Sequence, residues 1–259
     1  MIISHKHQYI FFKPLKVAGS SIEVALSKCL GNNDVHTGTS YLREINSDVY
    51  SYKVKNNFEI VEETTEQITA QPIFLSHTSP DDLIKQHSDW NQIKDYYKIT
   101  SVRNPWDLCV SYFWWTFNDY VTLGQERKYK IRENIAPMSY DTSTVLKIKF
   151  QSYLESRLDH TTVELGVKKD EDTLLSWFAR LQQSFFMSEH IDYVIRFEKL
   201  QEDLQACCEK LRLEMYPLQR LKSDVRKSSL PYQAYFNDYT KDLVADYFSN
   251  VITQYNYKF

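Results

Sequence analysis

The 259-residue sequence predicts an α/β fold in which a central, mainly parallel sheet is flanked by helices. Two observations predict it. Short apolar runs rich in β-forming residues recur at 8–12, 72–77, 96–102 and 192–197, and segments with apolar residues at helical spacing follow them. Such alternation is typical of sheets whose strands run parallel. Because the sequence has no repeat, low-complexity linker or clean break, we expect a single domain over residues 1–259.

The first strand, QYIFF at 8–12, leads through a short loop into a helix that starts near Ser20. Apolar residues then recur at helical spacing from Ile22 to Leu30, and Gly31 closes the segment. The chain therefore opens with a strand, a loop and a helix.

The following region is less regular. Residues 32–70 are polar, with short strands expected at Tyr50–Val54 and Phe58–Val61. The apolar run PIFLSH at 72–77 then predicts a second buried strand. A helix should start at Pro80, with Ser79 as its N-cap.

The remainder of the chain continues the alternation. YYKITSV at 96–102 predicts a third strand, followed by a helix from Pro105, and DYVIRF at 192–197 predicts a fourth strand. Loops are expected at 122–142 and 222–237, and helices at 143–157, 171–185, 202–213 and 238–254.

The composition argues against several classes of function. The net charge of −3 argues against a nucleic-acid partner, whose binding surface is normally basic. No signal peptide is visible, and no window approaches the roughly 18 apolar residues of a membrane span. We therefore expect a cytoplasmic protein with no membrane partner. The spacing of the cysteines matches neither a disulfide framework nor a zinc site, so they fit a reducing compartment. The cysteines are Cys29, Cys109, Cys207 and Cys208.

The loop between the first strand and its helix has the composition of an anion-binding site. In FFKPLKVAGSSIE (11–23), Gly19 allows a ligand to approach the backbone, Ser20 and Ser21 offer hydroxyl donors, and Lys16 supplies a positive charge. Backbone N–H groups and the helix dipole add to this attraction. The phosphate-binding patterns G-x-x-x-x-G-K-[ST] and G-x-G-x-x-G are both absent. The alternative interpretation is an ordinary turn with Ser20 as N-cap.

Basic residues stand near hydroxyl groups at two further places. In SVRNPWDLCVSYFWW (101–115), Arg103 follows a strand and Ser111 comes eight residues later. Arginine suits phosphate because it can donate two parallel hydrogen bonds. An ion pair with Asp107 is the alternative role of Arg103. The third place is the loop segment Arg226–Ser228, where solvated charge is the alternative. Three such places predict a ligand with more than one anionic group.

These segments together resemble the sulfotransferases that use 3′-phosphoadenosine 5′-phosphosulfate (PAPS), in their soluble carbohydrate and bacterial branch. FFKPLKVAGSSIE is similar to the family's 5′-phosphosulfate loop, SVRNPWDLCVSYFWW to its 3′-phosphate motif, and YVIRFEKLQEDLQACCEKL to its strand–helix segment with F-E-x-L-x-x-D. The aromatic-rich end of the chain is similar as well, so the resemblance spans nearly the whole sequence. One departure is Leu15, which stands where the family usually has proline. Counting from Gly19, Lys16 rather than Lys13 occupies the position of the family lysine.

The resemblance implies a P-loop-like nucleotide-binding fold and a donor site. Lys16 would stabilise charge on the leaving 5′-phosphate of PAPS, and the product would be 3′,5′-ADP (PAP). Arg103 and Ser111 would hold the 3′-phosphate. No metal is implied. The remaining donor-site residues that the resemblance implies are Val17, Ala18, Gly19, Ser20, Ser21, Arg226, Lys227 and Ser228.

An acceptor hydroxyl needs a general base, and His77 is the candidate. It ends the predicted strand PIFLSH, so it should lie at the same edge of the sheet as the loop. Histidine titrates close to neutral pH, which suits proton abstraction. Alternatively, His77 caps the next helix or is hydrogen-bonded at the edge of the core, and a carboxylate serves as the base. The other histidines are expected at the surface, and the candidate carboxylates are Glu59, Glu62 and Glu63.

The sequence thus predicts an enzyme that transfers a sulfuryl group from PAPS to a hydroxyl, or to an amine. The acceptor would be a small molecule, such as a secondary metabolite, or a carbohydrate. Two alternatives remain at this stage: an NTP-dependent, kinase-like enzyme, and a binding protein with the same fold and no activity. The oligomeric state is left open.

Overall fold

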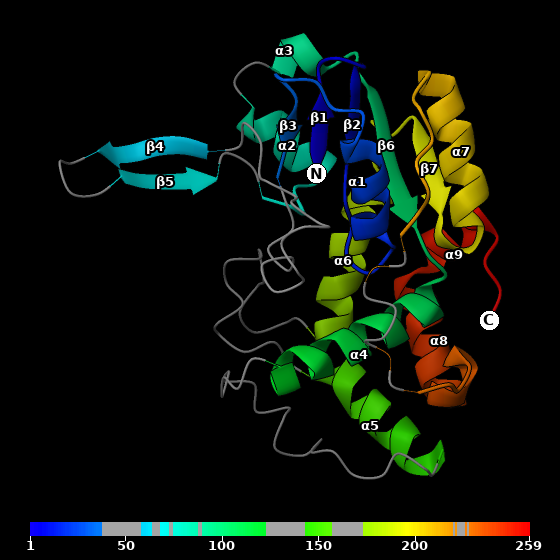
Figure 1. Cartoon of the computed structure of the whole chain (residues 1–259). Coiled ribbons are helices and arrows are strands. Elements are labelled where there is room, and N and C mark those ends of the chain that lie inside the picture. The colour runs from blue at the N-terminus through cyan, green and yellow to red at the C-terminus, as the bar shows by residue number, and fades with distance from the viewer. Residues whose placement is uncertain are drawn as a thin grey trace. The chain divides into compact units, whose positions relative to one another are not determined.

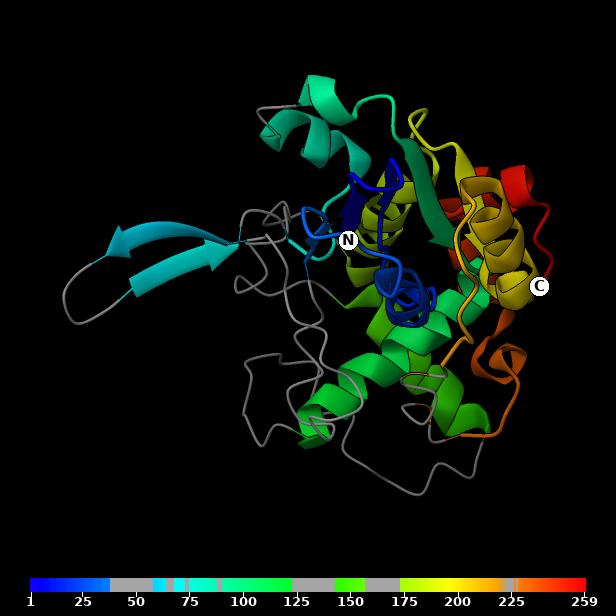
Figure 2. The ribbon, with the colours of Figure 1, turned by 45° about the horizontal axis from the view of Figure 1, so that its top comes forward.

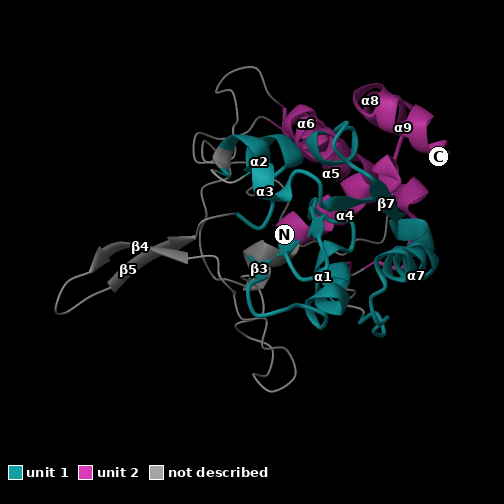
Figure 3. Ribbon diagram, turned by 90° about the horizontal axis from the view of Figure 1, so that it is seen from above, with its two compact units in different colours: residues 1–102, 184–221 teal, residues 103–183, 222–259 magenta. Residues whose placement is uncertain are grey.

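The computed structural model describes residues 1–37, 58–63, 68–72, 75–87, 90–122, 143–156, 173–219, 221, 226 and 228–259. The chain forms two compact units, each composed of two stretches of sequence (Figure 3). The first unit comprises Met1–Val102 and Ser184–Leu221, and the second comprises Arg103–Gln183 and Lys222–Phe259.

The first unit is built on a five-stranded sheet with the strand order β3-β1-β2-β6-β7 (Figure 1). β2 (Tyr9–Phe11) is parallel to β6 (Tyr97–Val102), which is parallel to β7 (Tyr193–Arg196). On the other side of β2, β1 (Ile2–Ser4) runs antiparallel to both β2 and β3 (Val35–His36). The α/β class is confirmed, and the sheet is mixed rather than mainly parallel.

Helices α1 (Gly19–Ser27) and α7 (Leu200–Leu211) cover the same face of this sheet (Figure 2). Alternate residues of β2 reach them, because successive side chains of a strand point to opposite faces. Their packing fixes the position of α1 directly after β2, where the candidate loop lies. The buried cluster consists of Ile2, Tyr9, Phe11, Ile22, Ala25, Leu26, Ile99, Ile195, Leu204, Cys207, Cys208 and Leu213.

The predicted strands at 8–12, 96–102 and 192–197 are confirmed as β2, β6 and β7. The buried strand predicted at 72–77 is wrong where the structure describes it. Pro72 ends β5 (Ile68–Pro72), His77 lies in a turn, and Leu75 is 61% exposed. β5 forms a separate antiparallel hairpin with β4 (Phe58–Glu63), which confirms the strand expected there. The strand expected at 50–54 lies outside the described residues.

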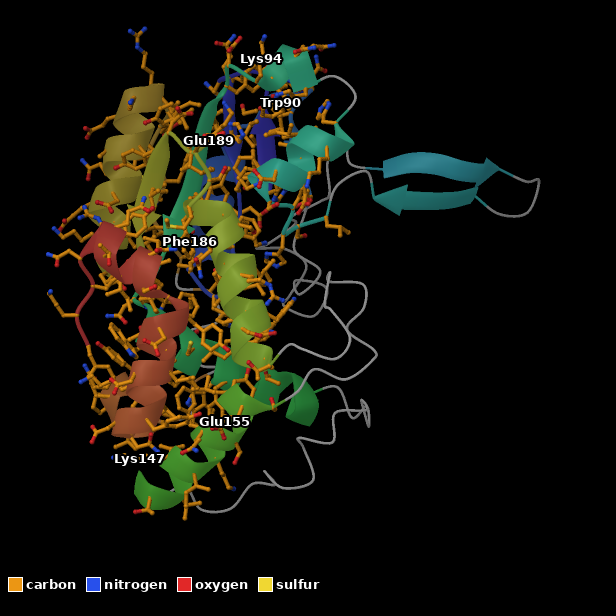
Figure 4. The ribbon with its side chains drawn as sticks, turned by 180° about the vertical axis from the view of Figure 1, so that it is seen from behind. Trp90, Lys94, Lys147, Glu155, Phe186 and Glu189 are labelled. Atoms are coloured by element: carbon orange, nitrogen blue, oxygen red, sulfur yellow. The ribbon has the colours of Figure 1, made fainter. Side chains whose placement is uncertain are left out.

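Two short helices of the first unit precede β6. Helix α2 (Pro80–Gln86) begins as predicted, since the Ser79 hydroxyl accepts the backbone N–H of Asp82. Helix α3 (Trp90–Ile93) begins at Trp90, and Lys94 directly follows it (Figure 4). The carbonyl of Lys94 accepts a hydrogen bond from the buried ammonium group of Lys98 on β6.

The second unit is helical in its described residues. Its helices are α4 (Pro105–Thr122), α5 (Ser143–Glu155), most of α6 (Leu174–Phe186), α8 (Asp238–Tyr247) and α9 (Ser249–Tyr255). Lys147 and Glu155 mark the course of α5 in Figure 4. The core of this unit is aromatic, with edge-to-face pairs among Phe113, Phe150, Tyr153, Tyr235 and Phe236.

The predicted helices are confirmed, with one refinement. The closing helix expected at 238–254 is divided at Phe248 into α8 and α9. Most of the loop expected at 122–142 lies outside the described residues. None of the helices in the described part of the chain is long and apolar enough to cross a membrane.

Candidate functional site

The loop between β2 and α1 has an alternating backbone conformation. Lys16 has φ 62° and Ala18 has φ 60°, whereas Val17 between them is not among the residues with positive φ. For residues other than glycine this left-handed conformation costs roughly 1 kcal/mol or more, so the surrounding packing must hold it. Successive residues of opposite hand turn their N–H groups toward one concave face, an arrangement that binds anions.

Helix α1 follows directly from this turn. The helix begins at Gly19 with Ala18 as its N-cap, and no side chain caps it. The N–H groups of Ser21 and Ile22 both donate to the Ala18 carbonyl. The interpretation with Ser20 as N-cap is therefore wrong, because the N-cap is Ala18, two residues earlier. Ser20 is half-buried, and the buried Ser21 hydroxyl accepts the Leu221 N–H at 3.4 Å.

Gly19 is required by a neighbouring side chain. A Cβ atom at this position would lie 2.7 Å from Cγ of Lys13, closer than two carbon atoms can approach. The aliphatic stem of Lys13 thus crosses the helix start where any other residue would carry its side chain. The glycine provides room for Lys13, in addition to any room it gives a ligand.

Lys13 ends in a buried ion pair. Its ammonium lies 2.5 Å from Oε2 of Glu23, and the two side chains are 6% and 1% exposed. The amino group of Met1 and the His36 ring also approach Glu23 Oε1, at 2.9 and 3.3 Å. Burial alone would raise the pKa of Glu23, but the charges of Met1 and Lys13 outweigh it and hold the pKa well below its usual range. His36 is thus buried, which corrects the expectation that it lies at the surface.

His77 is joined to the same cluster. Its Nδ1 lies 2.7 Å from the backbone carbonyl of Lys13, which can only accept, so Nδ1 carries the proton. Its Nε2 is then the acceptor of the neutral ring. Loss of water around the ring and the charge of Lys13 lower the pKa of His77 to about 4. The residue as a whole is exposed to solvent, and the lowered pKa of its ring makes His77 neutral at pH 7.

The second unit contains a cluster of two arginines around one carboxylate. Arg103 donates to Oδ2 of Asp107 through Nε at 2.8 Å, and Arg226 lies 3.5 Å from Oδ1 of the same residue. Two guanidinium groups and one carboxylate leave a net charge of +1 on a partly buried cluster. Arg226 also stacks over the Tyr235 ring and donates to the carbonyl of Leu230. The ion pair with Asp107, the alternative role of Arg103, is therefore present, and it includes Arg226.

Two hydroxyl groups accompany this cluster. Ser111 follows Asp107 by one turn of α4, so the two residues share a face of the helix. Ser228 is half-buried, and its hydroxyl accepts the N–H of Leu230. Lys227 lies outside the described residues.

The structure thus assembles the predicted residues in two places. Residues 16–21 and His77 belong to the first unit, whereas Arg103, Ser111, Arg226 and Ser228 belong to the second. Sequence reasoning missed Glu23 and the part played by Lys13. The sequence did contain a signal for this pair. Glu23 stands among the apolar residues of a predicted helix, and Lys13 directly follows the strand that precedes this helix. The carboxylates Glu59, Glu62 and Glu63 lie on β4.

Comparisons of this chain with protein-family models, with curated proteins and with solved structures give no match. Among the residues that the structure describes, no group of three or more His, Cys, Asp or Glu side chains could hold a metal ion. The site must therefore be interpreted from its own geometry and charges.

Proposed function

We propose that this chain is a sulfotransferase, which moves the sulfuryl group of PAPS to a hydroxyl group of a small molecule or a carbohydrate. One observation carries the proposal: the turn between β2 and α1 alternates in the sign of φ and leads into a helix that no side chain caps. Such a turn offers several N–H groups to a single anion. A lysine within the turn adds a full positive charge, which favours phosphate or sulfate.

In the proposed reaction, the acceptor oxygen attacks the sulfur of PAPS in line with the bond to the 5′-phosphate. A new S–O bond forms, the old S–O bond breaks, and 3′,5′-ADP leaves. Lys16 and the N–H groups of Val17–Ser20, with the Ser21 hydroxyl, stabilise the charge that develops on the departing phosphate. Lys13 is buried and paired with Glu23, and Lys16 is the lysine that occupies the family position counted from Gly19.

The acceptor proton passes to Nε2 of His77 as the acceptor attacks. The hydrogen bond from Nδ1 to the Lys13 carbonyl supports this role because it leaves Nε2 unprotonated. A neutral ring at pH 7 is the form that a general base requires. An amine acceptor would need the same residue, so the site admits both kinds of nucleophile.

The 3′-phosphate is assigned to Arg103, with Ser111, Arg226, Lys227 and Ser228 as further ligands. Arg103 and Arg226 together outweigh the charge of Asp107, which supports binding of a dianion at this cluster. From these assignments we expect a preference for a nucleotide with phosphates at both its 3′ and 5′ positions over a 5′-nucleotide alone. This preference separates the proposal from the kinase-like alternative.

A thermal-shift measurement with 3′,5′-ADP, ATP–Mg²⁺ and AMP tests the proposal. Ligand at about 100 times its Kd stabilises the folded state by about 2.7 kcal/mol. For a chain of this size the melting temperature should rise by about 5–10 °C. We expect this rise with 3′,5′-ADP and a smaller one with AMP, and we expect Lys16→Met and Arg103→Ala each to reduce it.

The matched control is Arg180→Ala, which removes an exposed arginine of α6 from the second unit. It should retain the full shift with 3′,5′-ADP. A shift with ATP–Mg²⁺ and none with 3′,5′-ADP would refute the sulfotransferase and favour the kinase-like enzyme. A shift with 3′,5′-ADP but no transfer from PAPS to any acceptor would favour the inactive binding protein.

A further inference from the structure

We propose that Lys13, held in place by Glu23, is the positioning residue of the candidate site: its carbonyl orients the His77 ring and its side chain fixes the start of α1. This inference rests on the proposed function, because it gives His77 the part of the base. It goes beyond that function by assigning a task to two residues that touch neither donor nor acceptor in the proposed reaction.

The first step of the argument is the anchoring of Lys13. Its side chain is 6% exposed and ends 2.5 Å from Glu23, which belongs to α1. A buried charge that is paired in this way holds its partner, because separating the two would leave an ion without water. Lys13 therefore joins the chain just after β2 to α1: its backbone follows β2, and its ammonium group is paired with Glu23 of α1.

The second step is the path of the side chain across the loop. The stem of Lys13 fills the space where Gly19 lacks a Cβ, so the helix start and the lysine constrain each other. The positive φ values at Lys16 and Ala18 require such a constraint, because neither residue would adopt them freely. The stem thus holds the conformation that gathers the N–H groups of the loop.

The third step is the connection to His77. The Lys13 carbonyl accepts the Nδ1 proton at 2.7 Å, which fixes both the tautomer and the plane of the ring. Three charged groups of the first unit influence the ring: the ammonium group of Lys13 and the amino group of Met1 favour its neutral form, and Glu23 opposes them. A single residue thus sets the orientation of the base and the geometry of the anion loop.

The experiment is an NMR measurement of the ¹⁵N shifts of the His77 ring as a function of pH. In the wild type we expect Nδ1 to carry the proton at pH 7, and the ring to titrate well below pH 6.5. In the double variant Lys13→Met/Glu23→Gln, which leaves neither partner of the pair charged, we expect the midpoint to rise by about one pH unit. The preference for the Nδ1–H tautomer should weaken at the same time.

A kinetic measurement on the same proteins completes the test. With PAPS and an acceptor, kcat of the double variant should fall by about tenfold or more while KM for PAPS changes less, because the base is displaced. The control is Lys98→Met, which removes another buried ammonium of the first unit, one that donates to the carbonyls of Lys94 and Tyr96. It should leave the His77 titration as in the wild type.

The outcomes separate this inference from the proposed function. An Nε2–H tautomer of His77 in the wild type would overturn the positioning role, and this measurement needs no variant to fold. An unchanged titration in the folded double variant would overturn it as well. If His77 behaves as expected but the wild type transfers no sulfuryl group, the proposed function fails while the placement of the ring by Lys13 stands.

Discussion

At the scale of single residues, Gly19 shows how the packing of a neighbouring side chain can require a glycine. A glycine before a helix in a small-residue loop is usually explained by the ligand. Here the nearest atom to its absent Cβ is Cγ of Lys13, at 2.7 Å. That stem cannot easily move aside, since its ammonium group is bound to buried Glu23. The glycine therefore also maintains the internal structure of the site.

Replacing Gly19 with alanine should destabilise the first unit by about 1–3 kcal/mol, the usual cost of inserting a methyl group into a packed region. The clash involves only the Lys13 stem, so the same replacement in a Lys13→Ala background should cost less than about 1 kcal/mol. Urea unfolding of the wild type, both single variants and the double variant measures this coupling. Additive changes in the free energy of unfolding would show that Lys13 does not set the requirement for glycine.

At the scale of secondary structure elements, the two ends of the chain show opposite ways to begin a helix. Helix α1 begins without a side-chain cap. Helix α8 is fully capped: Asn237 accepts the Thr240 N–H at 2.8 Å, and the Thr240 hydroxyl accepts the Asn237 N–H in return. In α8, the side chains of the N-cap and N3 residues thus satisfy two N–H groups that intrahelical hydrogen bonds leave without an acceptor.

The capping box of α8 is open to a direct measurement. Asn237→Ala should lower the free energy of unfolding by about 1 kcal/mol, because the Thr240 N–H loses its partner. Asn250→Ala in α9 removes an exposed asparagine that is not an N-cap, and it should change the stability by less than about 0.5 kcal/mol. Equal effects of the two replacements in urea unfolding would contradict the capping role.

The elements that the sequence predicted are those with a long local signal. Helices such as α4 and α7, and the apolar strands β2, β6 and β7, follow from periodicity and composition. Strands β1 and β3 have three and two residues and no comparable apolar run around them, and their pairing with β2 and with each other defines them. The prediction of a buried strand at 72–77 was wrong because a short apolar run does not by itself determine whether the segment is buried.

The sequence predicted only those parts of the candidate site that have a local signal. The loop at 16–21 and Arg103 stand out locally, because small and basic residues adjoin the end of a strand. The cluster of Lys13, Glu23 and His77 arises from contacts over 10 and 64 residues of separation, which no local pattern encodes. The sequence indicated this cluster only through Lys13 and Glu23, two charged residues that stand next to or within apolar segments.

At the scale of the whole molecule, several groups make the folded state sensitive to acid in the same direction. Burial alone would raise the pKa of Asp34 and Asp203, but hydrogen bonds from Ser4 and from Arg196, respectively, outweigh it and lower their pKa. The pKa of Glu23 is lowered by neighbouring positive charges. When a carboxyl group has a lower pKa in the folded state, the unfolded state takes up its proton first, so stability declines as the pH falls through the ordinary carboxyl range.

His77 extends this sensitivity to milder pH. Its pKa falls from an ordinary 6.5 to about 4 on folding, so between these values the unfolded chain binds a proton that the folded chain does not. The urea midpoint of the wild type should therefore decrease as the pH is lowered from 6.5 toward 4.5, before the carboxyl groups contribute. His77→Gln should flatten the curve in this window and leave the decline below about pH 4.5. If the wild-type midpoint stays constant from pH 6.5 to 4.5, the His77 ring gains its proton as readily in the folded chain as in the unfolded one, and the lowered pKa is wrong.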